Sequence, residues 1–191
     1  TITAISGDPA IKIHNTTGTI KLVDLSVKNT LGAGIDISSH KGPVIITNVV
    51  ANDNLKDGLR IDNSQNVGGK YVNMGNVTVT NSAFLRNGVA GAGDNYSGLT
   101  IVSSGSILLN GVTASANAGD GADFILYGPS LLVRNSVFSG NIDNPDLSAW
   151  GFGIYTYTYP LNAPAAITLD NVILNGNDAD GAYLVTGGNI M

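Results

Sequence analysis

A short phrase that recurs along the whole chain constrains the fold more than any other feature. A small residue, almost always glycine, is followed by an apolar residue, by a residue of any kind and by one more residue that is mostly apolar. The copies begin at Ala10, Gly34, Gly58, Gly98, Gly121, Gly153 and Gly181, at steps of 24, 24, 40, 23, 32 and 28 residues. A unit of about 24 residues, lengthened only at particular copies, is typical of a solenoid.

A second phrase follows the first in most units. It is an apolar alternation that ends in Asn, followed by a short apolar stretch and another Asn. Two strands and two turns per unit are therefore predicted. Parallel strands stack about 4.8 Å apart, and an amide side chain both donates and accepts, so equivalent asparagines are expected to form structural ladders. The predicted ladders are Asn48, Asn81, Asn110, Asn135 and Asn171, and Asn54, Asn87, Asn117, Asn141 and Asn177.

The composition favours an all-β chain. All 14 acidic residues are Asp, Glu is absent, and there are 22 Asn and 25 Gly among 191 residues. Strong helix formers are therefore scarce and turn formers abundant. We expect one domain over residues 1–191, a β-solenoid of about seven turns that belongs to a larger protein or assembly.

The charge pattern excludes several partners. The formal net charge is −5 and the nine Lys and Arg residues are not clustered, which argues against nucleic acid. No apolar run approaches the ~20 residues that span a bilayer, so no membrane insertion is expected. The chain has no Cys, which excludes disulfides and thiolate metal sites.

Strand alternation predicts where each side chain of the first phrase points. The residues one and three positions after the small residue face inward, and the residue between them faces outward. The outward series is Lys12, Asp36, Arg60, Thr100, Asp123, Tyr155 and Tyr183. Three insertions are predicted to leave the coil as loops, at residues 63–76, 142–150 and 157–164.

Aromatic residues give the candidate binding site. Tyr155, Tyr157 and Tyr159 alternate along one strand and should share its outward side, with Trp150 and Phe152 just before them. Exposed Tyr and Trp rings suit stacking on sugars or on another protein, because each has an apolar face and a polar tip. The alternative is that an inserted loop folds over these aromatic residues, which then form a small satellite core.

Together, the glycine-led strand, the Asn-ended strand and the recurring Asn-Gly and Asp-Gly turns resemble the parallel β-helix repeat of the pectate-lyase-like superfamily. The repeats are most similar to those of large bacterial surface β-helix proteins. This resemblance implies a single-stranded right-handed parallel β-helix and an extracellular or cell-surface location of bacterial type. It does not determine function, because the fold hosts lyases, hydrolases, tailspikes and adhesins.

No catalytic residues are predicted. The Asn-Thr-Asp, Asp-Asp, Gly-His-Gly and Arg-Ile-Lys motifs of polygalacturonase-type enzymes are absent. Arg60 with Asp36 and Asp62 is the nearest approach to the arginine and Ca²⁺-binding carboxylates of pectate lyases, and it is expected four turns away from the aromatic residues. His14, Ser38 and Asp62 superficially supply a nucleophilic triad, but the stacking order puts the hydroxyl, not the imidazole, in the middle.

No cofactor and no metal are predicted either. His14 and His40 would form a poor metal site without a carboxylate. The Asp-rich turns at 52–57 and 175–180 offer oxygen ligands that suit Ca²⁺, although Asn and Asp are also ordinary turn residues.

The leading functional hypothesis is a non-catalytic extracellular structural or adhesive β-solenoid segment. It would associate end to end with itself or with neighbouring domains and so form a fibre. The alternatives are a polysaccharide lyase or hydrolase of the β-helix type, or a carbohydrate-binding β-helix without turnover.

Overall fold

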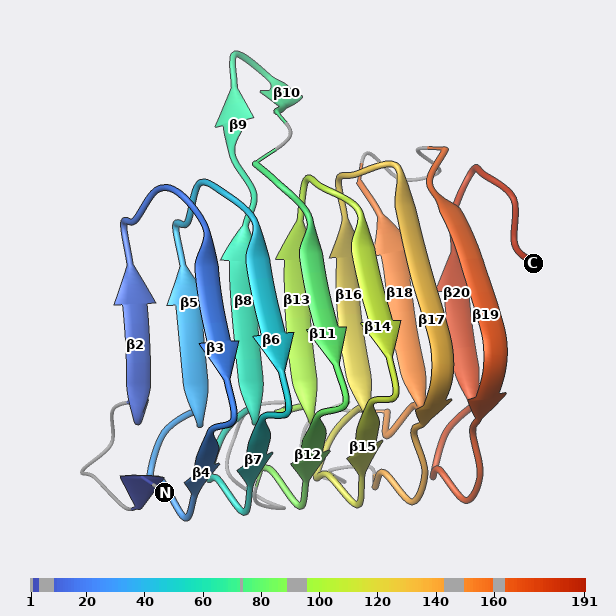
Figure 1. Cartoon of the computed structure of the whole chain (residues 1–191). Helices are drawn as coiled ribbons and strands as arrows, with labels where there is room; N and C mark the ends of the chain where they lie inside the picture. Colours follow the sequence, from blue (N-terminus) through green and yellow to red (C-terminus); the bar gives the residue numbers. More distant parts are fainter. Residues whose placement is uncertain (1, 4–8, 73, 89–95, 143–149, 160–163) are drawn as a thin grey trace.

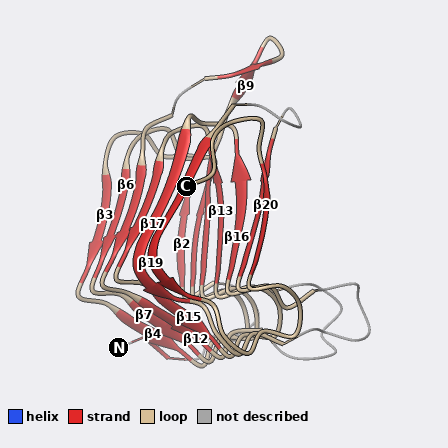
Figure 2. Ribbon diagram, turned by 90° about the vertical axis from the view of Figure 1, so that its right-hand side faces the viewer, coloured by secondary structure: helices blue, strands red, loops and turns tan. Residues whose placement is uncertain are grey.

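The described part of the chain is a coil of parallel β-strands. A computed structural model describes residues 2–3, 9–72, 74–88, 96–142, 150–159 and 164–191, and every regular element in them is a strand. Successive turns stack side by side from β2 to β20 (Figure 1). Figure 2 looks along this stack and shows three rows of strands enclosing the interior. The described residues contain no helix long and apolar enough to cross a membrane.

The glycine-led phrases form one seven-stranded parallel sheet. Its strands are β2 (Ile11–His14), β5 (Ile35–Ser38), β8 (Leu59–Asn63), β13 (Leu99–Ser103), β16 (Ala122–Leu126), β18 (Ile154–Thr158) and β20 (Ala182–Val185), in that order. Equivalent positions of successive copies are register partners, as Leu99 is of Leu59 and Ala122 is of Leu99. The repeat therefore sets the register of the sheet despite the insertions.

The remaining strands form two further rows. The Asn-ended phrases make β3 (Ile20–Val23), β6 (Val44–Thr47), β11 (Val77–Thr80), β14 (Ile107–Asn110), β17 (Ser130–Val137) and β19 (Ala166–Ile173). The third row comprises β1 (Ile2–Thr3), β4 (Ser26–Lys28), β7 (Val50–Asn52), β12 (Ala83–Leu85) and β15 (Thr113–Ser115). The long β17 pairs with strands of both rows and joins them into one 11-stranded sheet.

The prediction of two strands per unit is therefore wrong. Most units have three strands, because the short apolar stretch after the first Asn pairs as well. Asn48 and Asn81 adopt positive φ between two strands, and Asn135 and Asn171 do so within the long strands β17 and β19, a conformation that Asn tolerates better than most residues. The bend at these residues turns the chain from one wall of the coil to the next.

The core fills the space between the three rows. The inward positions of the seven-stranded sheet are fully buried from β5 to β18, for example Ile35 and Ile37, Leu59 and Ile61, and Leu99 and Ile101. Phe84, Phe124 and Phe138 are the largest fully buried side chains. The inward alternation expected from the sequence thus holds along the centre of the stack.

The inner asparagines are joined by hydrogen bonds that run from turn to turn. The Nδ2 atom of each donates to the Oδ1 atom of the next, from Asn54 to Asn87 (2.8 Å), Asn117 (3.2 Å), Asn141 (3.0 Å) and Asn177 (2.9 Å) in turn. The outer series lies nearer the surface. There Asn135 Nδ2 donates to Asn110 Oδ1, and Asn171 Nδ2 to Asn135 Oδ1 (3.0 and 2.9 Å).

Two of the predicted insertions can be followed in the described residues. Within 63–76 the antiparallel hairpin of β9 (Asn66–Val67) and β10 (Lys70–Tyr71) projects from the coil (Figure 1). The segment 157–164 does not begin as a loop, because Tyr157 and Thr158 continue β18 and pair with β16. Residues 143–149 and 160–163, in the predicted loops 142–150 and 157–164, lie outside the described residues.

Candidate functional site

One outward row of the seven-stranded sheet contains both charged and aromatic candidate residues. Register pairs join Asp36 to Arg60, Arg60 to Thr100, Thr100 to Asp123, Asp123 to Tyr155 and Tyr155 to Tyr183. The row is therefore charged at the β5–β8 end and aromatic at the β18–β20 end. Asp123 lies directly beside the aromatic end.

Four aromatic side chains make a continuous group at that end, which we call the aromatic shelf: Trp150, Phe152, Tyr155 and Tyr183. The Tyr155 and Tyr183 rings are parallel, with centroids 5.5 Å apart and an interplanar angle of 6°. Phe152 contacts the other three rings at centroid distances of 5.4 to 6.0 Å. Phe152 is buried, whereas Trp150 and Tyr183 are 61% and 45% exposed. The shelf therefore has a buried base and an open surface.

Two shallow hollows open on the shelf. One, of about 190 Å³, is lined by the four shelf residues alone. The other, of about 420 Å³, is lined by Trp150, Phe152 and Tyr183 together with Asp178, Ala179 and Asp180. Exposed ring faces beside a hollow are suited to an amphipathic ligand such as a sugar ring.

The predicted aromatic set is divided between two clusters. Trp150 and Tyr155 belong to the shelf, and Tyr157 meets the edge of Tyr155 at 6.2 Å. Tyr159 instead contacts Tyr127 and Tyr71, at 5.6 and 5.9 Å.

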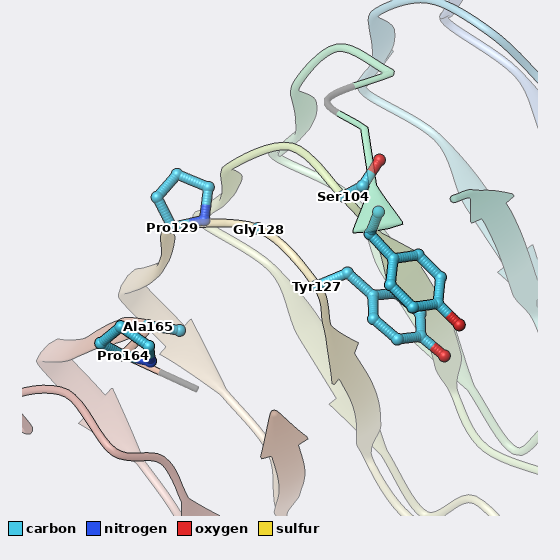
Figure 3. A pocket seen from close by; sticks show the side chains of 7 residues that line it. Ser104, Tyr127, Gly128, Pro129, Pro164 and Ala165 are labelled. Carbon is cyan, nitrogen blue, oxygen red and sulfur yellow. The ribbon is translucent and has the colours of Figure 1, made fainter. Parts of the chain in front are cut away.

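The second cluster borders a different hollow. Tyr71, at the end of the projecting hairpin, stacks on Tyr127 with centroids 3.5 Å apart. The hollow measures about 360 Å³, and its lining includes this pair, Ser104, Pro129 and Pro164 (Figure 3). Because Tyr71 and Tyr127 cover one face of each other, the cluster anchors the hairpin and offers less ring surface to a ligand than the shelf does.

Two buried aspartates each precede the glycine of their repeat and accept a backbone hydrogen bond from the next turn. Asp57 Oδ1 accepts a hydrogen bond from the Ser97 amide (2.8 Å), and Asp120 Oδ1 accepts one from the Phe152 amide (2.9 Å). Asp120 thus fixes the backbone of the buried shelf residue. Burial raises the pKa of Asp57 to about 6, although the Ser97 hydrogen bond and Arg60 oppose the rise.

Asp123 is a strongly perturbed carboxyl group on this face. Its Oδ1 atom is buried and has no hydrogen-bond partner. Burial, followed by the nearby carboxylates of Asp120 and Asp57, raises the pKa of Asp123 to about 7. A carboxyl group that keeps its proton near neutral pH can donate to a bound oxygen or act as a general acid.

This raised pKa predicts that the protein loses stability as the pH rises. Between about pH 4 and 7 Asp123 ionises in the unfolded chain, where its pKa is near 3.8, but keeps its proton in the folded state. Asp123 therefore lowers the free energy of unfolding over that window. We expect Asp123→Asn to match the wild type at pH 4 and to exceed it by up to about 4 kcal/mol at pH 8, as measured by urea unfolding across the range.

The matched control is Asp170→Asn, at an exposed position on β19. It should retain the pH dependence of the wild type. If Asp123→Asn retains it as well, a solvated Asp123 carboxylate at neutral pH is indicated and the assignment of a raised pKa is wrong.

The lyase-like set does not converge. Asp36 and Arg60 are register partners, but Asp62 accepts hydrogen bonds from the amide and hydroxyl of Ser64. Arg60 forms no ion pair with either carboxylate within 4 Å. The ion pair found among the described residues joins Arg86 to Asp53 instead. The expected spacing was one step too long: Arg60 lies three strand steps from Tyr155, as the order of the outward series also gives.

The histidines engage neighbours one turn away. His14 Nδ1 lies 3.0 Å from Ser38 Oγ, and His40 Nδ1 lies 2.9 Å from Thr16 Oγ1. With Asp62 bonded to Ser64, the three candidate triad residues do not form a relay. The two imidazoles have different partners and do not form the weak metal pair considered above.

The first Asp-rich turn is occupied by structural contacts. Asn54 belongs to the inner ladder and Asp53 forms an ion pair with Arg86. Asp57 accepts a hydrogen bond from the Ser97 amide. In the second turn, Asp178 and Asp180 line the larger shelf hollow. No group of three or more His or Asp side chains in the described ranges is placed to hold a metal ion.

Sequence reasoning missed several residues of this face as site residues. Asp57 and Asp120 precede their strands and lie outside the alternation that was used to assign directions. Phe152 lies just before β18, and Tyr183 joins the shelf as the register partner of Tyr155 across units of unequal length. The Asp-Gly dipeptides at 57–58, 120–121 and 180–181 were a usable signal, since they mark one equivalent position in three units.

The rows of parallel strands, the Asn ladders and the outward aromatic face define a parallel β-solenoid. A family model described as a right-handed beta helix region matches residues 9–191, so the chain belongs to that family. The match covers the described coil almost completely and confirms the fold class expected from the repeats. No curated protein and no solved structure gave a significant match.

Proposed function

We propose that this chain is a saccharide-binding β-solenoid, and that the aromatic shelf is its binding surface. The observation that carries the proposal is the contact group of Trp150, Phe152, Tyr155 and Tyr183, which leaves two ring systems about half exposed beside two hollows. Exposed aromatic rings held in fixed positions lose little conformational entropy on binding, which favours stacking on a sugar ring.

The arrangement of the shelf supports a polymer better than a small ligand. The hollows are shallow, and the outward row continues from the shelf to Asp123 and Thr100 across neighbouring strands. Strands are spaced about 4.8 Å apart, so the row offers a linear track along the solenoid axis. A saccharide chain could lie along this track and contact several turns. Such binding is also what an adhesive β-solenoid requires.

A second candidate function is hydrolysis of the bound saccharide. It is favoured by Asp123, whose raised pKa of about 7 leaves a proton available beside Tyr155. Glycoside hydrolysis needs such a proton donor together with a second carboxylate, and Asp120 lies near enough to influence the Asp123 pKa. Analysis of the incubated saccharide for shortened products distinguishes turnover from binding alone.

Removal of an exposed shelf ring should weaken binding. We expect Tyr183→Ala to reduce the affinity for a short oligosaccharide about tenfold, the equivalent of ~1.4 kcal/mol, because one stacking face is lost. Isothermal titration calorimetry against a panel of neutral, acidic and basic oligosaccharides measures it. Circular dichroism would verify that the variant keeps its strand content.

Tyr159→Ala is the matched control. Tyr159 is 51% exposed, similar to Tyr183, and is also on the outward side, but it belongs to the cluster with Tyr71 and Tyr127. It should leave the affinity within about twofold of the wild type. An equal loss from both variants would contradict the assignment of binding to the shelf, and a panel in which nothing binds would overturn the proposed function.

A further inference from the structure

The charges of this chain are divided along the solenoid axis. Residues 1–86 contain eight of the nine Lys and Arg residues and both histidines. Residues 87–191 contain eight Asp and a single basic residue, Arg134. Arg134 lies on β17, in the 11-stranded sheet rather than the sheet that carries the shelf. The formal charge of the second part is therefore −7 at neutral pH, and the shelf lies within it.

Carboxyl groups border the shelf on both sides. On the β20 side, Asp178 and Asp180 are exposed and line the larger hollow together with the Trp150 and Tyr183 rings. On the β16 side, Asp123 is the register partner of Tyr155 and has a buried Oδ1 atom with no hydrogen-bond partner. Asp123 and Asp120 also contribute to a raised Tyr155 pKa, after the larger effect of burial.

Aromatic faces flanked by carboxylates recognise a particular chemistry. A cation is attracted to the negative face of Trp or Tyr, and carboxylates add charge-assisted hydrogen bonds to an ammonium group. A uronic acid would be repelled by the carboxylates of Asp178 and Asp180, which line the larger hollow. It would find no basic side chain on β13, β16, β18 or β20 to offset that repulsion.

We infer that the shelf binds a saccharide bearing protonated amines, such as a glucosamine polymer, in preference to neutral or acidic saccharides. The inference rests on the proposed function, because it names the class of sugar for the same surface. The sugar rings lie on Trp150 and Tyr183, and an ammonium group enters the larger hollow toward Asp178 and Asp180. The open rim of that hollow admits the neighbouring sugars of a polymer.

Three matched oligomers test this preference at pH 6 and low salt: glucosamine, N-acetylglucosamine and galacturonic acid. The first two share one backbone and differ in the charge on nitrogen. We expect the glucosamine oligomer to bind about tenfold more tightly than its N-acetylated form, because a cation–π contact and an exposed ion pair each contribute a few-fold. The advantage should shrink as salt is added, since exposed charges are screened.

The double variant Asp178→Asn/Asp180→Asn isolates the carboxylates. It should bring the preference for glucosamine down to about threefold or less and leave the affinity for the N-acetylated oligomer unchanged. Asp170→Asn, an exposed carboxylate on β19, is the control and should change neither. A preference that survives the double variant in full would overturn the role of Asp178 and Asp180.

The remaining outcomes separate this inference from the proposed function. If the N-acetylated or the acidic oligomer binds as tightly as glucosamine, or more tightly, the inference fails while saccharide binding stands. If none of the three binds, both fail. If glucosamine binds equally well to the Tyr183→Ala variant, charge alone attracts it to the acidic part of the chain, and the shelf is not its site.

Discussion

Asn117→Ala should destabilise the protein by about 3 kcal/mol. Asn117 is fully buried, and its Oδ1 atom accepts hydrogen bonds from the Asn87 backbone and side-chain amides (2.9 and 3.2 Å). Its Nδ2 atom donates to Asn141 Oδ1 (3.0 Å). Alanine removes these hydrogen bonds from the Asn87 amides and from Asn141 Oδ1 inside the coil. Each buried group left unsatisfied costs about 1–3 kcal/mol. Thermal unfolding should show a midpoint lower by roughly 10 °C.

Asn110→Ala is the control from the outer series. Asn110 also accepts a hydrogen bond from a ladder neighbour, Asn135, but near the surface, where water can replace it. We expect a loss below about 1 kcal/mol. If the two variants lose the same stability, the inner ladder contributes no more than a surface hydrogen bond, and its role in holding the turns together is wrong.

Gly121→Ala should be at least as damaging, by about 3 kcal/mol or more. A Cβ atom at this position would lie 2.6 Å from the Gly153 carbonyl oxygen, 2.7 Å from Asn141 Nδ2 and 2.9 Å from the Ala114 carbonyl oxygen. Two of these atoms are backbone and the third belongs to the inner ladder, so none can move without breaking other bonds. The measurement is urea unfolding followed by circular dichroism.

Gly176→Ala provides the comparison. Gly176 has a φ of +63°, and a Cβ atom there would meet nothing within 4 Å. Its cost is therefore backbone strain alone, about 1 kcal/mol. A larger loss at Gly176 than at Gly121 would show that backbone conformation, rather than close stacking of turns, explains the glycines of this chain.

The repeat made most of the fold predictable. Strand alternation has a fixed period of two, so inward and outward residues such as Ile61 and Arg60 followed directly from the position of Gly58. The third row of strands was missed because a strand of three residues, as in Val50–Asn52, is too short to show a period. The outward row, and with it the neighbours of Asp123, follows from register once the units are aligned.

The candidate site was only partly predictable. Trp150 and Tyr155 were recognised from their residue types, and Phe152 lies between them just before β18. Tyr183 completes the shelf from the next turn, as the register partner of Tyr155. The separation of Tyr159 from the shelf depends on Tyr71, which arrives from a hairpin more than 80 residues earlier in the chain. Contacts made by an insertion have no signature in the repeat itself.

The fluorescence of Trp150 tests the central claim most directly. Trp150 is the single tryptophan of the chain and is 61% exposed on the shelf, so its emission reports on this surface alone. Titration with a glucosamine oligomer should shift the emission to shorter wavelength and protect it from a soluble quencher, with a midpoint that matches the calorimetric affinity. Binding detected by calorimetry without any change in Trp150 emission or quenching would place the saccharide elsewhere and contradict the account.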